Sequence, residues 1–314
     1  MCPKKNSKKF PITNNDSFFQ IIKSELKVFK EFQNLPEIML DQISSIAWHS
    51  NFLKNLICLW PGDVYKIITG NSHKVSEEIN NTFLNVLQFS ELKLRKTIRI
   101  HRSRVSLFCS INECLNIIDT PEVWKWMSNS ADIAIASTIN WLINDLIQNK
   151  VICINDIREI GFTALALGKL GGEELNFLSD VDLVFIFDPK KSNLDFESAN
   201  KVYVKMIRRF IDLMERYDEN GTGWKIDLRL RPDPSATAIV ISEDAAISYY
   251  ESLARTWERA AYIRSRVVGG NILMGKNFLN LISPFVWRKY LDYSVISELS
   301  SLLSQLQKLI YHNQ

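Results

Sequence analysis

The stretch NFLSDVDLVFIF (176–187) places two aspartates, Asp180 and Asp182, directly before a run of apolar residues. The run is short and rich in β-branched and aromatic residues, which predicts a buried strand. Because side chains alternate along a strand, both aspartates lie on one face, while Leu183 and Phe185 lie on the other. Two carboxylates about 7 Å apart along a strand can converge on one or two hard cations. Taken alone, an Asp-x-Asp sequence is more often a pair of solvated loop acids.

A second strand is predicted over WKIDLRLRP (224–232), because polar and apolar residues alternate until Pro232. On this strand Asp227, Arg229 and Arg231 share one face. A third carboxylate from a neighbouring strand is what a two-metal phosphoryl-transfer site needs. Arginine also donates paired hydrogen bonds to phosphate oxygens, so this face suits a polyphosphate. The alternative is an exposed strand face on which Asp and Arg pair with each other.

A glycine-rich segment, ALGKLGGEELN (166–176), precedes the two aspartates. Glycine permits close approach of the backbone to a phosphate, and the segment lies between a predicted strand and a short helix expected near Glu173. Lys169 would add a cation for the phosphate. The segment matches neither the P-loop nor the dinucleotide-binding pattern, so a plain turn between two elements is the alternative. The glycines concerned are Gly168, Gly171 and Gly172.

Composition limits the classes of function. The 314 residues are 46% hydrophobic and 23% charged, enough for one large or two modest domains, and the net charge of +3 favours neither a nucleic-acid nor a membrane partner. Five scattered cysteines without a CxxC pair indicate neither a zinc site nor a disulfide scaffold, and suit a reducing cytoplasm. No apolar run is long enough to span a bilayer.

Hydrophobic periodicity predicts a helical region over 16–150, a strand–helix core over 151–270 and a helical segment over 271–314, after a disordered basic tail at 1–15. The helices are expected over 17–32, 37–59, 75–108, 121–148, 198–217, 242–260 and 293–311.

Two charged segments have weaker functional signals. In KLRKTIRIHRSR (93–104) the basic residues lie opposite an apolar stripe, which predicts a solvated helix face, and His101 has no neighbour that would make it a general base. In SYYESLARTWERAAYIRSRVV (248–268) the charged residues either line a cleft or pair with one another, while the aromatic residues pack.

Together, four sequence blocks are more specific than their parts: LGKLGGEELNFLSDVDLVF, DLRLRPDPSATAIVIS, WERAAYIRSRVVGG and PFVWRKYLDY. In this combination the chain resembles the bacterial glutamine synthetase adenylyltransferase/adenylyl-removing enzymes, in particular their first nucleotidyltransferase half, over about residues 90 to 314. The resemblance implies an α+β nucleotidyltransferase fold, a short mixed sheet packed with helices and flanked by N-terminal and C-terminal helices.

The resemblance also implies an activity: removal of AMP from an adenylylated tyrosine of glutamine synthetase by phosphorolysis, giving ADP. It implies Mg²⁺ as cofactor, ATP, ADP or AMP and phosphate as small-molecule ligands, and the PII protein as regulator. The implied catalytic and metal-binding residues are Asp180, Asp182 and Asp227. We assign nucleotide and phosphate binding to Gly168, Lys169, Gly171, Gly172, Ser179, Arg229 and Arg231.

The chain is much shorter than members of that family, so we expect a truncated form that lacks the second nucleotidyltransferase domain. Two alternatives therefore stay open. The first is a stand-alone nucleotidyltransferase with another substrate, and the second is a catalytically incomplete fragment.

Overall fold

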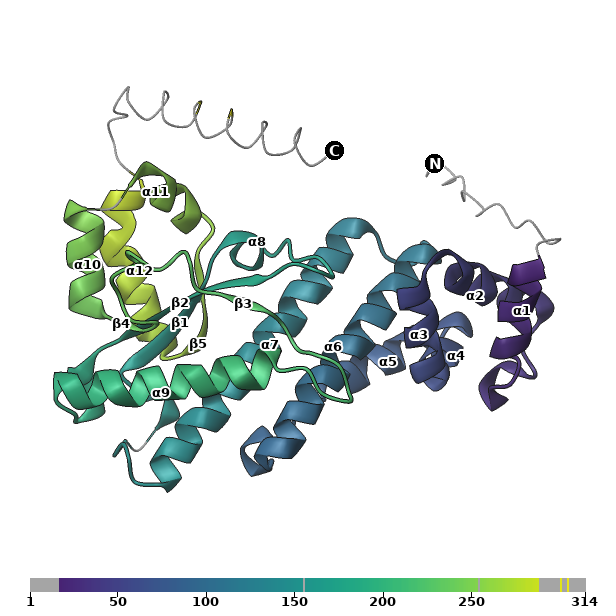
Figure 1. The fold of residues 1–314 in the computed structure, drawn as a ribbon, viewed down its shortest axis with the longest axis horizontal. Coiled ribbons are helices and arrows are strands. Elements are labelled where there is room, and N and C mark those ends of the chain that lie inside the picture. Colours follow the sequence, from purple (N-terminus) through teal and green to yellow (C-terminus); the bar gives the residue numbers. More distant parts are fainter. Residues whose placement is uncertain (1–16, 155, 254, 288–299, 301–303, 305–314) are drawn as a thin grey trace. The chain divides into compact units, whose positions relative to one another are not determined.

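The computed structural model describes residues 17–154, 156–253 and 255–287, together with 300 and 304 (Figure 1). The expected basic tail and the expected helix over 293–311 lie outside these residues, apart from Ser300 and Ser304. The chain divides into two compact units. Unit 1 is formed by Met1–Ala134, Glu174–Leu178 and Tyr217–Gly223, and unit 2 by Ile135–Glu173, Ser179–Arg216 and Trp224–Gln314.

Unit 1 is helical, as the periodicity predicts. Its helices are α1 (Ser17–Leu26), α2 (Glu37–His49), α3 (Asn51–Leu59), α4 (Pro61–Ile68), α5 (Ser72–Asn80), α6 (Glu91–Cys114) and the first half of α7 (Thr120–Gln148). The single helices expected over 37–59 and 75–108 are each divided in two. Ser50 has extended backbone and its hydroxyl accepts a hydrogen bond from the Leu53 N–H at 3.3 Å, so it ends α2 and caps α3.

The prediction of a solvated basic face on α6 is wrong for two of its arginines. Arg99 is buried and forms an ion pair with Asp218 at 2.9 Å. Arg102 donates to the carbonyl oxygen of Phe177 at 3.2 Å and to that of Gly223. Helical periodicity identifies the polar face of α6, but segments distant in sequence cover that face and use the guanidinium groups to satisfy their own polar atoms.

Unit 2 contains a mixed five-stranded sheet in which the strands follow the order β3-β2-β1-β5 and β4 also pairs with β2. β1 pairs antiparallel with β2 and β5, whereas β2 pairs parallel with β3 and β4. The expected α+β fold with a short mixed sheet is therefore confirmed. The strands are β1 (Phe162–Ala166), β2 (Val181–Phe187), β3 (Ile226–Asp227), β4 (Ile241–Ser242) and β5 (Arg266–Gly270).

The helices of unit 2 lie on both sides of the sheet (Figure 1). They are the second half of α7, α8 (Gly168–Gly171), α9 (Phe196–Glu215), α10 (Glu243–Ser252), α11 (Thr256–Tyr262) and α12 (Ile272–Val286). The helix expected over 242–260 is thus two helices, and the one expected to reach residue 217 ends at Glu215. Short 3-10 turns occur at Lys30–Phe32, Val86–Gln88, Ile157–Glu159 and Pro189–Ser192.

β2 is buried on both faces. On one face Phe185 packs edge-on against Phe210 of α9 with ring centroids 5.7 Å apart, and stacks against Phe162 of β1 at 5.8 Å. On the other face Val184 and Ile186 belong to a buried cluster with residues of α10 and α12. Burial on both faces explains why the sequence reads as a continuous apolar run. Asp182 shares the face of Val184 and Ile186, at the start of the strand.

No helix among the residues that the structure describes is both long enough and apolar enough to cross a membrane. The four cysteines in the described ranges, Cys58, Cys109, Cys114 and Cys153, form no disulfide with one another.

Candidate active site

Asp182 and Asp227 are neighbours across two parallel strands. The register pairs Val181 with Ile226 and Asp182 with Asp227. Adjacent strands lie about 4.8 Å apart, so the two carboxylates start from backbone positions close enough to share a ligand. The pairing is short, because it ends where β3 ends.

The predicted strand over 224–232 is wrong beyond Asp227. The backbone N–H of Arg229 turns back to donate to Asp227 Oδ1 at 2.8 Å, which is a local alternative to strand pairing. Arg229 Nε also donates to Asp227 Oδ2 at 2.8 Å, and Nη2 donates to the same oxygen. The Arg229 side chain is 83% exposed and that of Asp227 only 10%, so a solvent-facing guanidinium covers an almost buried carboxylate. This contact lowers the pKa of Asp227.

Arg231 lies in the loop that separates β3 from β4. Its Nη1 donates to the Leu228 carbonyl at 2.8 Å, and its Nη2 donates to the carbonyls of Pro234 at 2.8 Å and Thr237 at 3.4 Å. These bonds fasten the loop that joins the two short strands on one edge of β2. Phosphate binding by Arg231 stays a prediction. In this structure its side chain donates hydrogen bonds to backbone carbonyls of the loop.

Asp180 lies directly before β2, and Lys225 lies directly before β3. The Lys225 ammonium donates to Asp180 Oδ2 at 2.8 Å, and this hydrogen bond raises the pKa of Lys225. The sequence interpretation did not include Lys225. Its position two residues before Asp227 was the available signal, because a period of two puts both side chains on one face.

Gly168 lies against the Asp182 carboxylate. The glycine has a φ of +55°, and a Cβ atom built on it would lie 2.2 Å from Asp182 Oδ2. A side chain there is excluded both by the contact and by the left-handed backbone. The neighbouring Leu167 N–H donates to the Asp182 carbonyl at 3.0 Å, which holds the two segments together.

The glycine-rich segment itself forms helix α8, so the expectation of a helix beginning near Glu173 is wrong. The turn is closed by bonds from the Gly171 N–H to the Leu167 carbonyl at 2.8 Å and from the Gly172 N–H to the Gly168 carbonyl at 3.1 Å. Glu173 has a φ of +56° and follows the end of the turn.

Lys169 and Ser179 link α8 to the segment that carries the aspartates. Lys169 is exposed, and its Nζ donates to Ser179 Oγ at 3.1 Å. Ser179 directly precedes Asp180. The structure therefore brings the predicted glycines, Lys169 and Ser179 together with Asp182 at one end of β2.

Two arginines complete the surroundings of α8: Arg264, which lies in the turn before β5, and Arg266, the first residue of β5. A Cβ atom on Gly171 would lie 2.2 Å from the Arg264 carbonyl oxygen, and one on Gly172 would lie 2.9 Å from Arg264 Cδ. Arg266 Nη2 donates to the Leu170 carbonyl at 2.8 Å. The sequence left open whether these charges line a cleft or pair with each other, because nothing local places residue 264 beside residue 172.

Electrostatics at the three aspartates favour a cation. Burial raises the pKa of Asp182, and the nearby charges of Asp227 and Asp180 raise it further, while Arg229 and Lys169 lower it. Carboxylate oxygens are ligands that Mg²⁺ prefers. The described part of the chain nevertheless holds no His, Cys, Asp or Glu group of three or more already arranged around a metal. Asp180 and Asp227 are turned toward Lys225 and Arg229, so the donor set fits a divalent ion only once these side chains rotate.

Comparison with known proteins identifies the family. The family model described as glutamate-ammonia ligase adenylyltransferase matches residues 40–281. Similar curated proteins include two named bifunctional glutamine synthetase adenylyltransferase/adenylyl-removing enzyme. The one from Agrobacterium fabrum is 34% identical over 221 residues, which is 69% of this chain and 22% of the relative. The one from Xanthobacter autotrophicus is 31% identical over 274 residues, which is 85% of this chain and 28% of the relative.

The chain spans less than a third of the length of these relatives. The matched region includes α8, β2 and β3, and therefore all three aspartates of the candidate site. Since one family model covers most of its length, the chain belongs to the glutamate-ammonia ligase adenylyltransferase family.

Proposed function

We propose that the chain is a nucleotidyltransferase that removes AMP from adenylylated glutamine synthetase by Mg²⁺-dependent phosphorolysis in the cytoplasm. The observation that carries the proposal is the pairing of Asp182 with Asp227 beside Gly168, in a chain of this family. The names of the relatives contain both an adenylylating and an adenylyl-removing activity. The removing reaction is favoured because the sequence blocks resemble the first nucleotidyltransferase half.

The reaction exchanges one phosphorus–oxygen bond for another. An oxygen of monohydrogen phosphate forms a bond to the phosphorus of the tyrosine-linked AMP, and the bond from that phosphorus to the tyrosine oxygen breaks. The proton of the phosphate ends on the tyrosine oxygen, so the products are tyrosine and ADP. No strong base is required, since the attacking phosphate already carries an ionised oxygen.

The side chains of the site would have different roles in this reaction. Asp180, Asp182 and Asp227 would hold Mg²⁺, which when bound neutralises the phosphodiester and stabilises the charge on the transferring phosphorus. Gly168 keeps space for the Asp182 carboxylate, and Lys169 and Arg229 offer positive charge on the solvent side. Arg229 would exchange the Asp227 carboxylate for a phosphate group, which offers an equivalent pair of acceptor oxygens.

The test is release of ADP from adenylylated glutamine synthetase. Purified chain, the adenylylated enzyme, Mg²⁺ and inorganic phosphate are incubated together, and ADP and the loss of AMP from the tyrosine are measured in parallel. Omission of phosphate or addition of a chelator should stop both signals. Formation of adenylyl-tyrosine from ATP and unmodified glutamine synthetase would instead assign the adenylylating direction.

A catalytically incomplete chain is the second candidate, and it is favoured by the ion pairs that already engage Asp180 with Lys225 and Asp227 with Arg229. It predicts neither ADP release nor binding of a Mg²⁺–nucleotide complex in calorimetry. Binding without turnover of adenylylated glutamine synthetase would point to another substrate. Addition of PII protein to an active sample tests whether this chain alone responds to that regulator.

A further inference from the structure

The single turn of α8 has the Asp182 carboxylate at its start and the Arg264 side chain at its end. At the start, the position of a Cβ atom on Gly168 is 2.2 Å from Asp182 Oδ2. At the end, the position of a Cβ atom on Gly172 is 2.9 Å from Arg264 Cδ and 3.0 Å from Arg264 Nη1. The Arg264 guanidinium group therefore lies against the backbone of Gly172, where the side chain of any other residue at position 172 would stand in its way.

The length of the turn sets the spacing of these two groups. Gly168 and Gly172 are four residues apart, and one helical turn rises about 5.4 Å. A phosphodiester held at the aspartates and a second phosphate bonded to Arg264 would thus lie within one turn of each other. The two phosphorus atoms of a nucleoside diphosphate lie no farther apart than this. The long Arg264 side chain and a metal at the aspartates can both reach toward a ligand with this spacing.

Three other arginines lie near the turn. Arg266 donates to the Leu170 carbonyl, and Arg231 donates to three loop carbonyls. Arg229 lies on Asp227. The exposed Arg264 side chain lies against Gly172 at the end of α8, whereas Asp182 lies against Gly168 at its start. The exposed Lys169 belongs to α8 itself.

We propose that Arg264 binds a second phosphate, next to the phosphate of AMP. This second phosphate is the attacking inorganic phosphate before the reaction and the β-phosphate of ADP after it. The role of Arg264 in binding the attacking phosphate rests on the proposed function. Its recognition of the β-phosphate of ADP does not rest on that function. Gly171 and Gly172 are required because the Arg264 carbonyl and side chain occupy the space of their missing Cβ atoms. Lys169 adds a second positive charge to the same anion.

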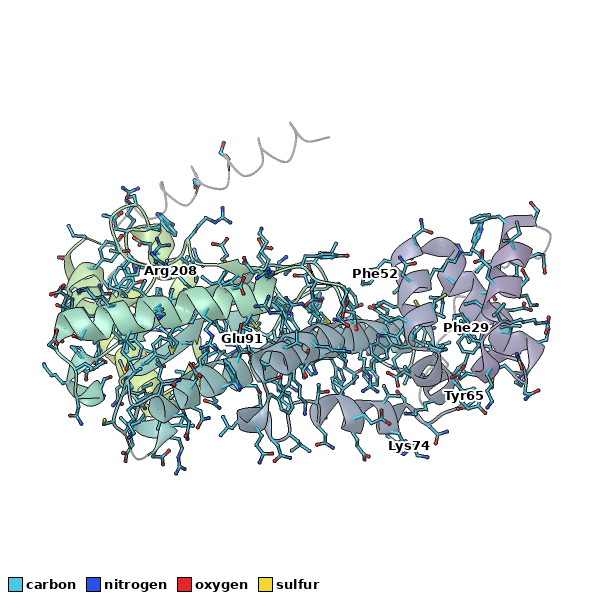
Figure 2. All side chains as sticks on the ribbon, turned by 60° about the horizontal axis from the view of Figure 1, so that its bottom comes forward. Phe29, Phe52, Tyr65, Lys74, Glu91 and Arg208 are labelled. Carbon is cyan, nitrogen blue, oxygen red and sulfur yellow. The ribbon has the colours of Figure 1, made fainter. Side chains whose placement is uncertain are left out.

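The experiment compares binding of ADP and AMP to the full chain in the presence of Mg²⁺. Arg264→Gln should weaken ADP binding by about 10-fold or more and change AMP binding by less than about 3-fold, because only ADP presents the second phosphate. Arg264→Lys keeps the charge without the paired donors, and its affinity for ADP should lie between those of the wild-type chain and Arg264→Gln. Arg208→Gln is the matched control, since Arg208 is exposed on α9 (Figure 2) and its loss should change neither affinity.

The outcomes separate this inference from the proposed function. A selective loss of ADP affinity supports it whether or not the chain releases ADP from adenylylated glutamine synthetase. Equal losses for ADP and AMP would show that Arg264 only supports the fold of α8, and would overturn it. Unchanged affinities in Arg264→Gln, or a wild-type chain that binds neither nucleotide, would overturn it as well. In an active sample, Arg264→Gln should raise the KM for phosphate more than it lowers kcat.

Discussion

Gly168 contacts the carboxylate of Asp182 because it has no side chain: a Cβ atom there would lie 2.2 Å from Asp182 Oδ2. The contact joins the glycine-rich turn to the aspartate that has both of the other candidate carboxylates as electrostatic neighbours. It therefore makes one backbone position responsible for the orientation of a side chain that is 14 residues later in the sequence.

Gly168→Ala should reduce activity far more than stability. The methyl group would displace the Asp182 carboxylate, and a displaced catalytic group of this kind costs on the order of 100-fold in kcat. The left-handed backbone adds a cost of about 1–2 kcal/mol in the free energy of unfolding. Gly70→Ala is the control, because Gly70 has a φ of +84° with open space around it and reports the backbone cost alone. Equal activity in the two variants would contradict the prediction.

Asp182→Asn should abolish ADP release while making the protein more stable at neutral pH. Loss of a charge that acts on the transferring group costs roughly 100-fold to 1,000-fold. The folded pKa of Asp182 is raised above its unfolded value, so its ionisation destabilises the folded state. This penalty is absent below the unfolded pKa and develops as pH rises toward the folded pKa. Urea unfolding at pH 7 should show a higher midpoint for the variant, and a lower midpoint would show that the carboxylate is instead stabilising.

Lys225→Met should strengthen binding of a divalent cation. The ammonium of Lys225 occupies Asp180 Oδ2, and a solvent-exposed ion pair of this kind is weak, so release of the carboxylate should raise affinity by up to about 5-fold. Mn²⁺ is a suitable probe, since its binding can be followed by electron paramagnetic resonance without substrate. Lys201→Met removes the same charge from a pair with Glu197 on α9 and should leave Mn²⁺ affinity unchanged. A weaker affinity in Lys225→Met would mean that Lys225 orients Asp180 for the metal rather than competing with it.

The stability of the chain should fall between pH 6.5 and pH 4 through His101. This side chain is fully buried on α6, with Nε2 2.9 Å from Ser130 Oγ, and burial lowers its pKa to about 4. The unfolded chain takes up a proton near pH 6.5, and the folded protein does so only near pH 4, so acidification favours unfolding. The difference amounts to about 2 kcal/mol between pH 7 and pH 5. His101→Gln should flatten this part of the profile of unfolding free energy against pH, and an unchanged slope would exclude His101 as its source.

The elements predicted with success are those in which local pattern and tertiary environment agree. β2 reads as an apolar run because both of its faces are buried, and α9 has Tyr203, Ile207, Phe210 and Met214 on one buried stripe. Tyr217 continues the same spacing in sequence but is exposed, because the helix has already ended at Glu215. Periodicity thus indicates which face is buried more reliably than where the element ends.

The failures arise where side chains bond to backbone or to distant segments. Alternation over 224–232 predicts a strand, but Arg229 folds back onto Asp227, and Arg231 uses its donors on loop carbonyls. The approach of Arg264 to Gly172 cannot be read from spacing, since 92 residues separate them. The same holds for Arg99 and Arg102 of α6, whose partners lie in segments that join unit 1 only after the chain has passed through unit 2.

The chain passes repeatedly between its two units, and this has a practical consequence for dissecting it. Residues 174–178 and 217–223 belong to unit 1, yet each leads into a strand that carries a candidate aspartate. An excision beginning at residue 151 would keep Leu175 and Gly223 but delete Ser128, which accepts a hydrogen bond from the Leu175 N–H at 3.0 Å, and Arg102, which donates to the Gly223 carbonyl. Such an excision would therefore separate the segments that lead into β2 and β3 from their hydrogen-bond partners, so domain swaps or minimal fragments should retain the helical region in full.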